Sequence, residues 1–236
     1  MAGYLGSTAQ WERFNARWKS LLADYGASQM HRADLECFQR EFKSWDSSRR
    51  TEFVKKAHSI IKKHTYVAVA TGVIKADFEQ VMPSWVKKLF GGVYGWCANE
   101  CLVHVGKWCE KRSYRDPINW VFEAGTAGHG QVSDLFEALH EHPEWGPRLC
   151  IGSWSFEDKS VVPLQAADTI AYEVFKHIEN QIIDQGKRTV RLSVLDLVRP
   201  SDESYLKYWD RGRLQKSLLN WEAKTRALAA KRPAGF

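Results

Sequence analysis

The chain has 236 residues, of which 44% are hydrophobic, and it contains 11 Trp. This length and composition can fill a complete core, which excludes a disordered protein and favours one large domain. No apolar run approaches the ~20 residues that a membrane helix requires, and the N-terminus lacks the pattern of an export signal. The five Cys occur at irregular spacing, which indicates reduced thiols. We therefore expect a cytoplasmic protein with no membrane partner.

The net charge of +6 favours an anionic partner without identifying it. The basic residues are spread along the chain in pairs: Arg49-Arg50, Lys55-Lys56, Lys62-Lys63, Lys87-Lys88, Lys111-Arg112 and Lys187-Arg188. Charge that is distributed in this way is typical of a broad basic surface rather than of a dedicated basic arm.

The predicted elements alternate between strands and helices. In chain order we expect a strand over 2–5, a helix from 7 or 8 to 25, an extended segment over 28–31, a helix over 47–63, a strand over 65–73, a helix over 95–112, a strand over 118–122, a helix over 132–140, a strand over 149–156, and helices over 163–182, 193–198 and 202–230. This order predicts an α/β fold with a mixed sheet flanked by helices. We expect one domain over residues 1–186 and a C-terminal helical extension over 187–236.

The helix over 163–182 carries the most informative residue. Its apolar residues recur at three- and four-residue spacing and predict the buried face: Leu164, Ala167, Ala171, Val174, Phe175, Ile178 and Ile182. Asp168 falls inside this stripe, where a carboxylate loses hydration at a cost of several kcal/mol unless something compensates it. An Arg or Lys, a helix N-terminus or a metal ion would do so. Asp168 is therefore a candidate site residue.

Two further acidic residues are candidates because of their positions. Glu123 follows the strand over 118–122, a strand-end position typical of active sites in open α/β sheets. Asp34 follows the extended segment over 28–31. If these carboxylates converge with Asp168, they need a divalent cation, and hard oxygen ligands select Mg²⁺ or Mn²⁺. Each acid also has a structural interpretation: Glu123 as a surface residue, Asp34 as a helix N-cap, and Asp168 as the partner of a buried Arg.

One cluster of metal-binding residue types has a simpler explanation. Cys97, Cys101 and His104 share a face of the helix over 95–112, with Cys109 further along. Zinc would require a fourth ligand, whereas buried Cys residues are common on helices that face a core. We therefore interpret these residues as part of the core.

Four segments together form a more specific pattern. They are Ala2-Gly3-Tyr4-Leu5 followed by Gln10-Trp11 and Trp18, then His31-x-x-Asp34, then Val121-Phe122-Glu123-Ala124-Gly125, and finally Pro163-Leu164-Gln165-Ala166-Ala167-Asp168 with Ala171-Tyr172. In order and spacing they resemble the bacterial and archaeal family known as domain of unknown function 3800, which is assigned a ribonuclease H-like fold. The resemblance extends from the first residues to about residue 180.

The resemblance implies a metal-dependent nuclease or phosphodiesterase that acts on nucleic acid, in phage defence or in a mobile element. In ribonuclease H-like enzymes, clustered acids hold one or two metal ions that activate water and stabilise the leaving oxygen. Carried over to this chain, Glu123 and Asp168 are metal ligands, Asp34 is a weaker ligand candidate, and His31 orients a ligand or binds phosphate. The alternative is a catalytically inactive nucleic-acid-binding or scaffold module of the same fold.

The chain departs from the family at its start. Family members begin with a strand that carries Asp-Glu-Ser-Gly, and its aspartate is the central metal ligand, whereas this chain begins at Met1-Ala2-Gly3-Tyr4. Either the start site is placed too far downstream, which we favour because the later segments look intact, or this version is catalytically impaired. Without that strand, the strand over 2–5 and its neighbour, over 118–122 or 65–73, would have free edges. We therefore expect self-association, for example as a homodimer.

Overall fold

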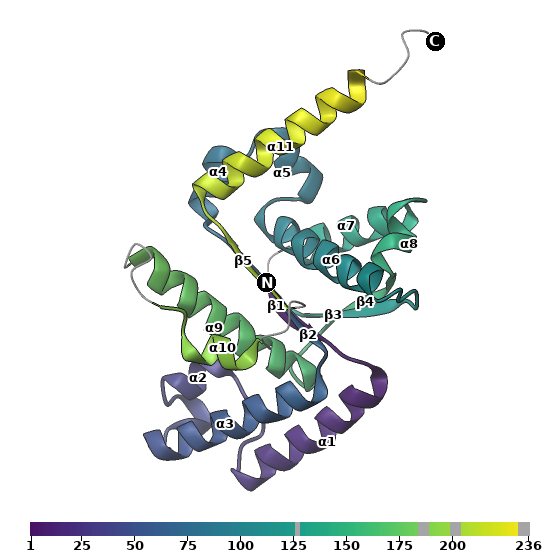
Figure 1. Cartoon of the computed structure of the whole chain (residues 1–236). Helices are drawn as coiled ribbons and strands as arrows, with labels where there is room; N and C mark the ends of the chain where they lie inside the picture. Colours follow the sequence, from purple (N-terminus) through teal and green to yellow (C-terminus); the bar gives the residue numbers. More distant parts are fainter. Residues whose placement is uncertain (126–127, 184–188, 199–203, 231–236) are drawn as a thin grey trace.

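A computed structural model describes residues 1–125, 128–183, 189–198 and 204–230 (Figure 1). The first elements are β1 (Ala2–Leu5), α1 (Thr8–Asp24), α2 (Arg32–Glu36), a 3-10 turn (Arg40–Phe42), α3 (Ser47–His64), β2 (Val67–Val73), α4 (Lys75–Val81), α5 (Ser84–Phe90) and α6 (Val93–Lys111). The following elements are β3 (Ile118–Glu123), α7 (His129–Glu141), α8 (Trp145–Leu149), β4 (Ile151–Glu157), α9 (Pro163–Ile183), α10 (Leu192–Leu197), β5 (Tyr205–Trp209) and α11 (Arg211–Ala230). The expected α/β class is confirmed.

The strands form two sheets rather than one. β1 pairs antiparallel with β2, and β5 pairs parallel with the other edge of β2. β3 and β4 pair in parallel as a separate sheet. α6 packs against β2, and its residues Cys101 and Val105 share a core cluster with Ile118 of β3. The two sheets are therefore joined by helices that contact both of them, α6 and α9, and not by strand pairing between β1 and β3.

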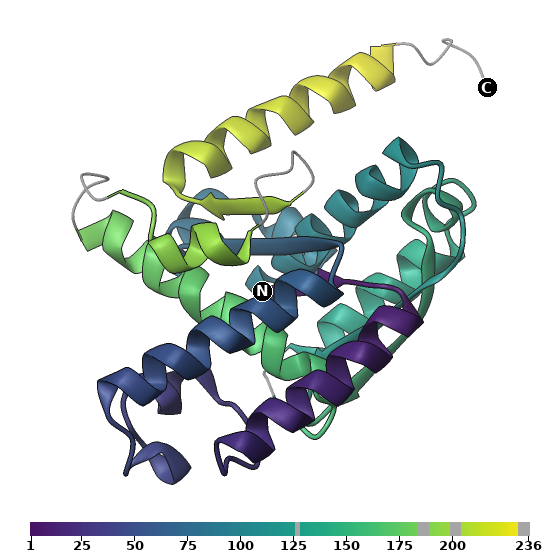
Figure 2. The same ribbon diagram turned by 60° about the horizontal axis from the view of Figure 1, so that its bottom comes forward.

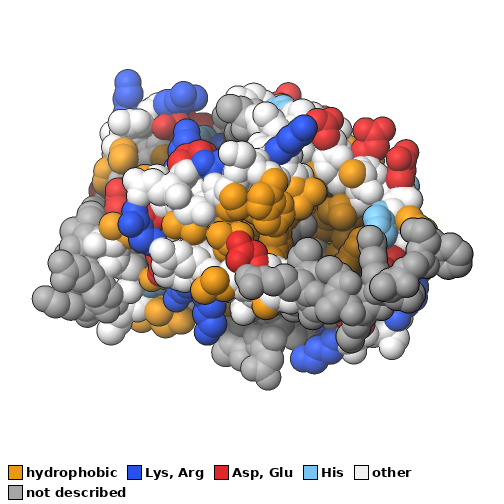
Figure 3. Space-filling model, turned by 90° about the horizontal axis from the view of Figure 1, so that it is seen from above, with side chains coloured by type: hydrophobic (Ala, Val, Ile, Leu, Met, Phe, Trp, Pro, Cys, Tyr) orange, Lys and Arg blue, Asp and Glu red, His pale blue; other side chains and the backbone are white. Residues whose placement is uncertain are grey.

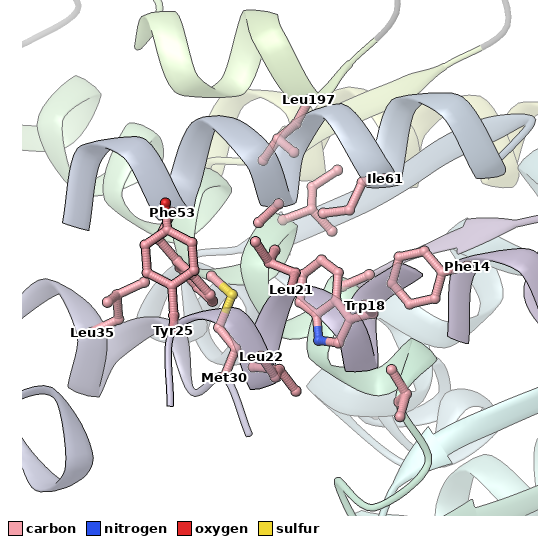
Figure 4. Packing of buried hydrophobic residues seen from close by; sticks show 14 of the residues in the cluster. Phe14, Trp18, Leu21, Leu22, Tyr25, Met30, Leu35, Phe53, Ile61 and Leu197 are labelled. Carbon is pink, nitrogen blue, oxygen red and sulfur yellow. The ribbon is translucent and has the colours of Figure 1, made fainter. Parts of the chain in front are cut away.

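The largest core cluster lies between the β1-β2-β5 sheet and helices α1, α3 and α9 (Figure 4). Ser7 begins α1 with a capping box that it forms with Gln10. Phe14, Trp18 and Leu21 then follow at helical spacing and are buried. α1 lies beside α3 (Figure 2). These two helices form the layer from which Trp18 reaches α9.

The structure differs from the predicted elements in several places. Residues 28–31 form no strand but a loop into α2, so Asp34 lies in the first turn of a helix. α4, α5 and α8 were not predicted. β5 lies where the last helix was expected, because aromatic residues in Tyr205–Trp209 favour a strand. The segment over 187–236 therefore adds a strand to the sheet. The expected domain boundary at 186 and the expected helix start at 202 lie outside the described residues.

The buried face of α9 coincides only in part with the predicted apolar stripe, of which Leu164 and Val174 are buried. Phe175 and Ile182 are 58% and 51% exposed, whereas Gln165 and Glu173 are buried. The polar residues face inward because other elements supply hydrogen-bonding partners for them, and apolar periodicity contains no information about those partners. Part of the predicted stripe instead lines an apolar hollow of about 530 Å³ beside Met1. In the view from above, apolar side chains gather in the middle of the face (Figure 3).

Among the described residues β3 pairs along one edge only, with β4, and we expect its other edge to promote self-association. The N–H groups of Ile118 and Ala124 point to the β4 side, so the alternation along the strand directs the N–H of Val121 to the opposite edge. The Val121 side chain is 45% exposed. We expect sedimentation velocity to reveal dimers or larger species that increase with concentration, and Val121→Lys to reduce them. Leu219→Lys, at an exposed apolar position on α11, should leave them unchanged. A wild-type monomer at every concentration would contradict this prediction.

Buried histidines predict a loss of stability in mild acid. Burial lowers the pKa of His58, although the neighbouring Asp196 acts in the opposite direction. Burial likewise lowers the pKa of His64 and His177. The unfolded chain then binds more protons than the folded chain below the unfolded pKa of about 6.5, so stability decreases as the pH falls through this range. Urea unfolding should give a lower free energy of unfolding at pH 5.5 than at pH 7.5, and an equal or higher value would refute the prediction.

Candidate functional site

Glu123 and Asp168 both form ion pairs with Lys159, an unpredicted residue. The Lys159 Nζ atom lies 3.3 Å from Glu123 Oε1 and 3.3 Å from Asp168 Oδ1. The two carboxylate oxygens are therefore at most twice this distance apart, although Glu123 ends β3 and Asp168 lies in the second turn of α9. The structure thus brings together two of the predicted site residues, and we refer to the three side chains as the Glu123–Lys159–Asp168 site.

The environment of Asp168 compensates its charge in two ways. One oxygen pairs with Lys159, and Oδ2 accepts a hydrogen bond from the backbone N–H of Arg32, at 2.8 Å. Arg32 is the first residue of α2, where backbone N–H groups are available to acceptors. The Asp168 side chain is 17% exposed and that of Glu123 is 42% exposed. The site therefore opens to solvent on the side of Glu123.

Gln165 holds the chain segments that form the site. Its Oε1 atom accepts hydrogen bonds from Trp18 Nε1 at 2.9 Å and from the N–H of Met30 at 2.8 Å. Its Nε2 atom donates to the carbonyl oxygen of Lys159 at 3.0 Å. One buried amide thus links α1, the loop before α2 and the loop before α9. It fixes the backbone that carries Lys159 and the backbone next to Arg32.

Asp34 and His31 do not join Glu123 and Asp168. Asp34 Oδ2 lies 3.2 Å from Arg40 Nε and 3.7 Å from His31 Nδ1. In the part of the chain that the structure describes, no three His, Cys, Asp or Glu side chains form a group that could hold a metal ion. The predicted cluster of three acids is therefore not formed. Residues 32–36 are helical, so the N–H of Arg32 contacts Asp168 whereas the Asp34 carboxylate lies beside Arg40.

An ionic network centred on the completely buried Glu173 lies next to the site. Glu173 Oε1 accepts hydrogen bonds from Arg32 Nε at 3.1 Å and from Arg32 Nη2 at 2.7 Å. Its other oxygen accepts from Arg191 Nε at 3.2 Å and from the Ser193 hydroxyl. Burial alone would raise the pKa of Glu173, but Ser193, Arg32 and Arg191 together lower it. Arg32 connects this network to the site, because its backbone contacts Asp168 and its guanidinium contacts Glu173.

The cysteines of α6 lie in the core, as interpreted from the sequence. Cys97 and Cys101 are 5% and 2% exposed. Burial raises the pKa of the Cys101 thiol to about 12, so it is protonated at neutral pH. Cys101 and Cys109 pack in one apolar cluster with Val67 and Val69 of β2.

The Glu123–Asp168 pair suits a hard divalent cation in its chemistry. Mg²⁺ is commonly bound by one or two carboxylates, with waters or substrate phosphates as its remaining ligands. Glu123 and Asp168 supply such oxygens, and the exposure of Glu123 leaves room for other ligands. The ammonium of Lys159 now lies between them. The two carboxylates thus have the donor chemistry of a divalent-cation site, and in this structure Lys159 is the cation between them.

No protein-family model, no curated protein and no solved structure matches the chain. In the described ranges, no helix is long and apolar enough to cross a membrane. The geometry of the Glu123–Lys159–Asp168 site is therefore the basis for a functional proposal.

Proposed function

We propose that the protein is a divalent-metal-dependent nuclease or phosphodiesterase with a ribonuclease H-like arrangement of its acidic residues. The observation that carries this proposal is the convergence of Glu123 and Asp168 on one cationic group, at 3.3 Å each. Glu123 is at a strand end, where open α/β sheets usually place their sites. The net charge of +6 suits a substrate rich in phosphate.

In this proposal each residue of the site has a separate role. Glu123 and Asp168 would hold Mg²⁺ or Mn²⁺, which supplies an activated water and neutralises charge on the phosphate. The Arg32 N–H orients the Asp168 carboxylate, and Gln165 fixes the loop of Lys159. Lys159 adds a positive charge next to the position of an incoming phosphate. Asp34 is given no ligand role here, because its carboxylate lies beside Arg40 and His31 and, within the described residues, it forms no three-residue group with the other two acids.

The direct test is cleavage of nucleic acids by the purified full chain. Labelled single-stranded DNA, double-stranded DNA and RNA would each be incubated with Mg²⁺, with Mn²⁺ or with EDTA. We expect slow cleavage of at least one substrate that requires the metal and stops in EDTA. Intact substrates under every condition would reject the nuclease proposal.

A second candidate function is a nucleic-acid-binding module without catalysis. It is favoured by Lys159, which already pairs with both carboxylates and offsets half of their charge, and by the pairing of Asp34 with Arg40 instead. Such a module would bind nucleic acid equally well with Mg²⁺ and with EDTA, and it would cleave none. Fluorescence anisotropy in parallel with the cleavage assay distinguishes the two functions.

A further inference from the structure

The Lys159 ammonium is unusually well enclosed for an ion-paired lysine of this protein. Its side chain is 11% exposed. The ion-paired side chains of Lys56, Lys62, Lys87 and Lys176 are between 30% and 53% exposed. Long basic side chains usually keep their charged end in water, so enclosure of this one requires a specific counter-charge. The two carboxylates at 3.3 Å provide it.

The backbone on both sides of Lys159 is also fixed. The Lys159 carbonyl accepts a hydrogen bond from Gln165 Nε2, at 3.0 Å. The preceding residue, Asp158, accepts a hydrogen bond from the N–H of Ser160 at 2.7 Å. The loop therefore directs the Lys159 side chain between β3 and α9. The cation between the carboxylates is part of the fold and does not result from the chance orientation of a surface side chain.

We infer that Lys159 is a displaceable counter-ion that competes with a divalent metal ion for Glu123 and Asp168. Two carboxylates next to one ammonium carry less net negative charge than the pair alone, so they attract a second cation more weakly. The same ammonium keeps the carboxylates from repelling each other when no metal is bound. This inference rests on the proposed function only in its choice of metal, since the competition does not require catalysis.

Binding of Mn²⁺ measures this competition without any reference to activity. The full chain would be titrated with Mn²⁺, and free Mn²⁺ would be followed by its electron paramagnetic resonance signal. We expect Lys159→Met to bind Mn²⁺ at least about tenfold more tightly than the wild type, because a competing positive charge is removed. Lys87→Met is the matched control, since Lys87 pairs with Glu79 at 3.0 Å outside the site, and its affinity should equal that of the wild type.

A double variant localises the effect. Lys159→Met combined with Asp168→Asn should lose the gain in affinity, because one of the two carboxylates is gone. Unchanged or weaker Mn²⁺ binding by folded Lys159→Met would overturn the inference. If Lys159→Met does not fold, Lys159→Gln retains a donor for the carboxylates and serves in the same comparison. If Lys159→Met binds Mn²⁺ more tightly but the protein cleaves no nucleic acid, the inference is supported and the proposed function is rejected. If the protein cleaves nucleic acid with metal but Lys159→Met does not bind Mn²⁺ more tightly, the proposed function is supported and the inference is rejected.

Discussion

Asp168→Asn should abolish metal-dependent cleavage while the protein remains folded. In the wild type the Arg32 N–H donates to Asp168 Oδ2 at 2.8 Å. Asn retains the shape of the side chain and an oxygen that can accept this hydrogen bond. It removes the negative charge that attracts a cation, so we expect the cleavage rate to fall by about 100-fold or more. Initial rates in Mg²⁺ and Mn²⁺ measure this effect, and circular dichroism with thermal unfolding measures the integrity of the fold.

Asp77→Asn is a closely matched control for this variant. Asp77 Oδ2 accepts the N–H of Arg211 at 3.0 Å, and its side chain is 20% exposed, compared with 17% for Asp168. The control therefore makes the same chemical change at an equivalent contact outside the site, and its cleavage rate should equal that of the wild type. If Asp168→Asn retains full activity, or if it mainly unfolds the protein, Asp168 is a structural residue and the proposed function is wrong.

Glu173→Ala should cause a large loss of stability. Glu173 is completely buried and pairs with Arg32, whose side chain is 5% exposed. Removal of the carboxylate takes away the acceptor of the Arg32 Nε and Nη2 donors, while Nη1 keeps Glu36 at 2.7 Å, and the loss of one member of a buried ion pair typically costs about 3–5 kcal/mol. Urea unfolding monitored by Trp fluorescence measures the change in the free energy of unfolding.

Glu179→Ala on the same helix provides the comparison. Glu179 pairs with Lys176 at 2.7 Å, but its side chain is 38% exposed. Water and salt screen such a pair, so its loss should change the free energy of unfolding by no more than about 1 kcal/mol. Similar losses for the two variants would show that the buried network does not stabilise the fold more than a surface ion pair does.

The regular elements could be predicted wherever a single periodicity describes them. The capped amphipathic helix α1 and the β-branched strand β2 lie within a few residues of their predicted bounds. Periodicity did not identify the strand β5, whose aromatic residues do have a local strand preference, or the buried polar residues of α9. β5 is stabilised by its pairing with β2, and α9 is oriented by hydrogen bonds to distant residues. Neither interaction has a signature in local spacing.

In the candidate site, too, residues with a local sequence signal could be predicted and residues whose roles depend on distant contacts could not. Glu123 and Asp168 could be identified because a strand end and an acid within an apolar stripe are local features. Lys159 and Gln165 could not, since their roles depend on contacts with β3, α1 and the loop before α2. Glu173 did have a sequence signal, as a second acid in a largely apolar helix. The structure does not bring Asp34 together with Glu123 and Asp168, because residues 32–36 form a helix that places its carboxylate beside Arg40.

The central claim is that Glu123 and Asp168 bind one divalent cation. Diffraction from crystals of the full chain soaked in Mn²⁺, with data collected at the manganese absorption edge, tests it most directly. We predict an anomalous peak in contact with carboxylate oxygens of both Glu123 and Asp168, with the Lys159 ammonium displaced from its position between them. The absence of a peak at the site, with Lys159 still paired to both carboxylates, would contradict the claim.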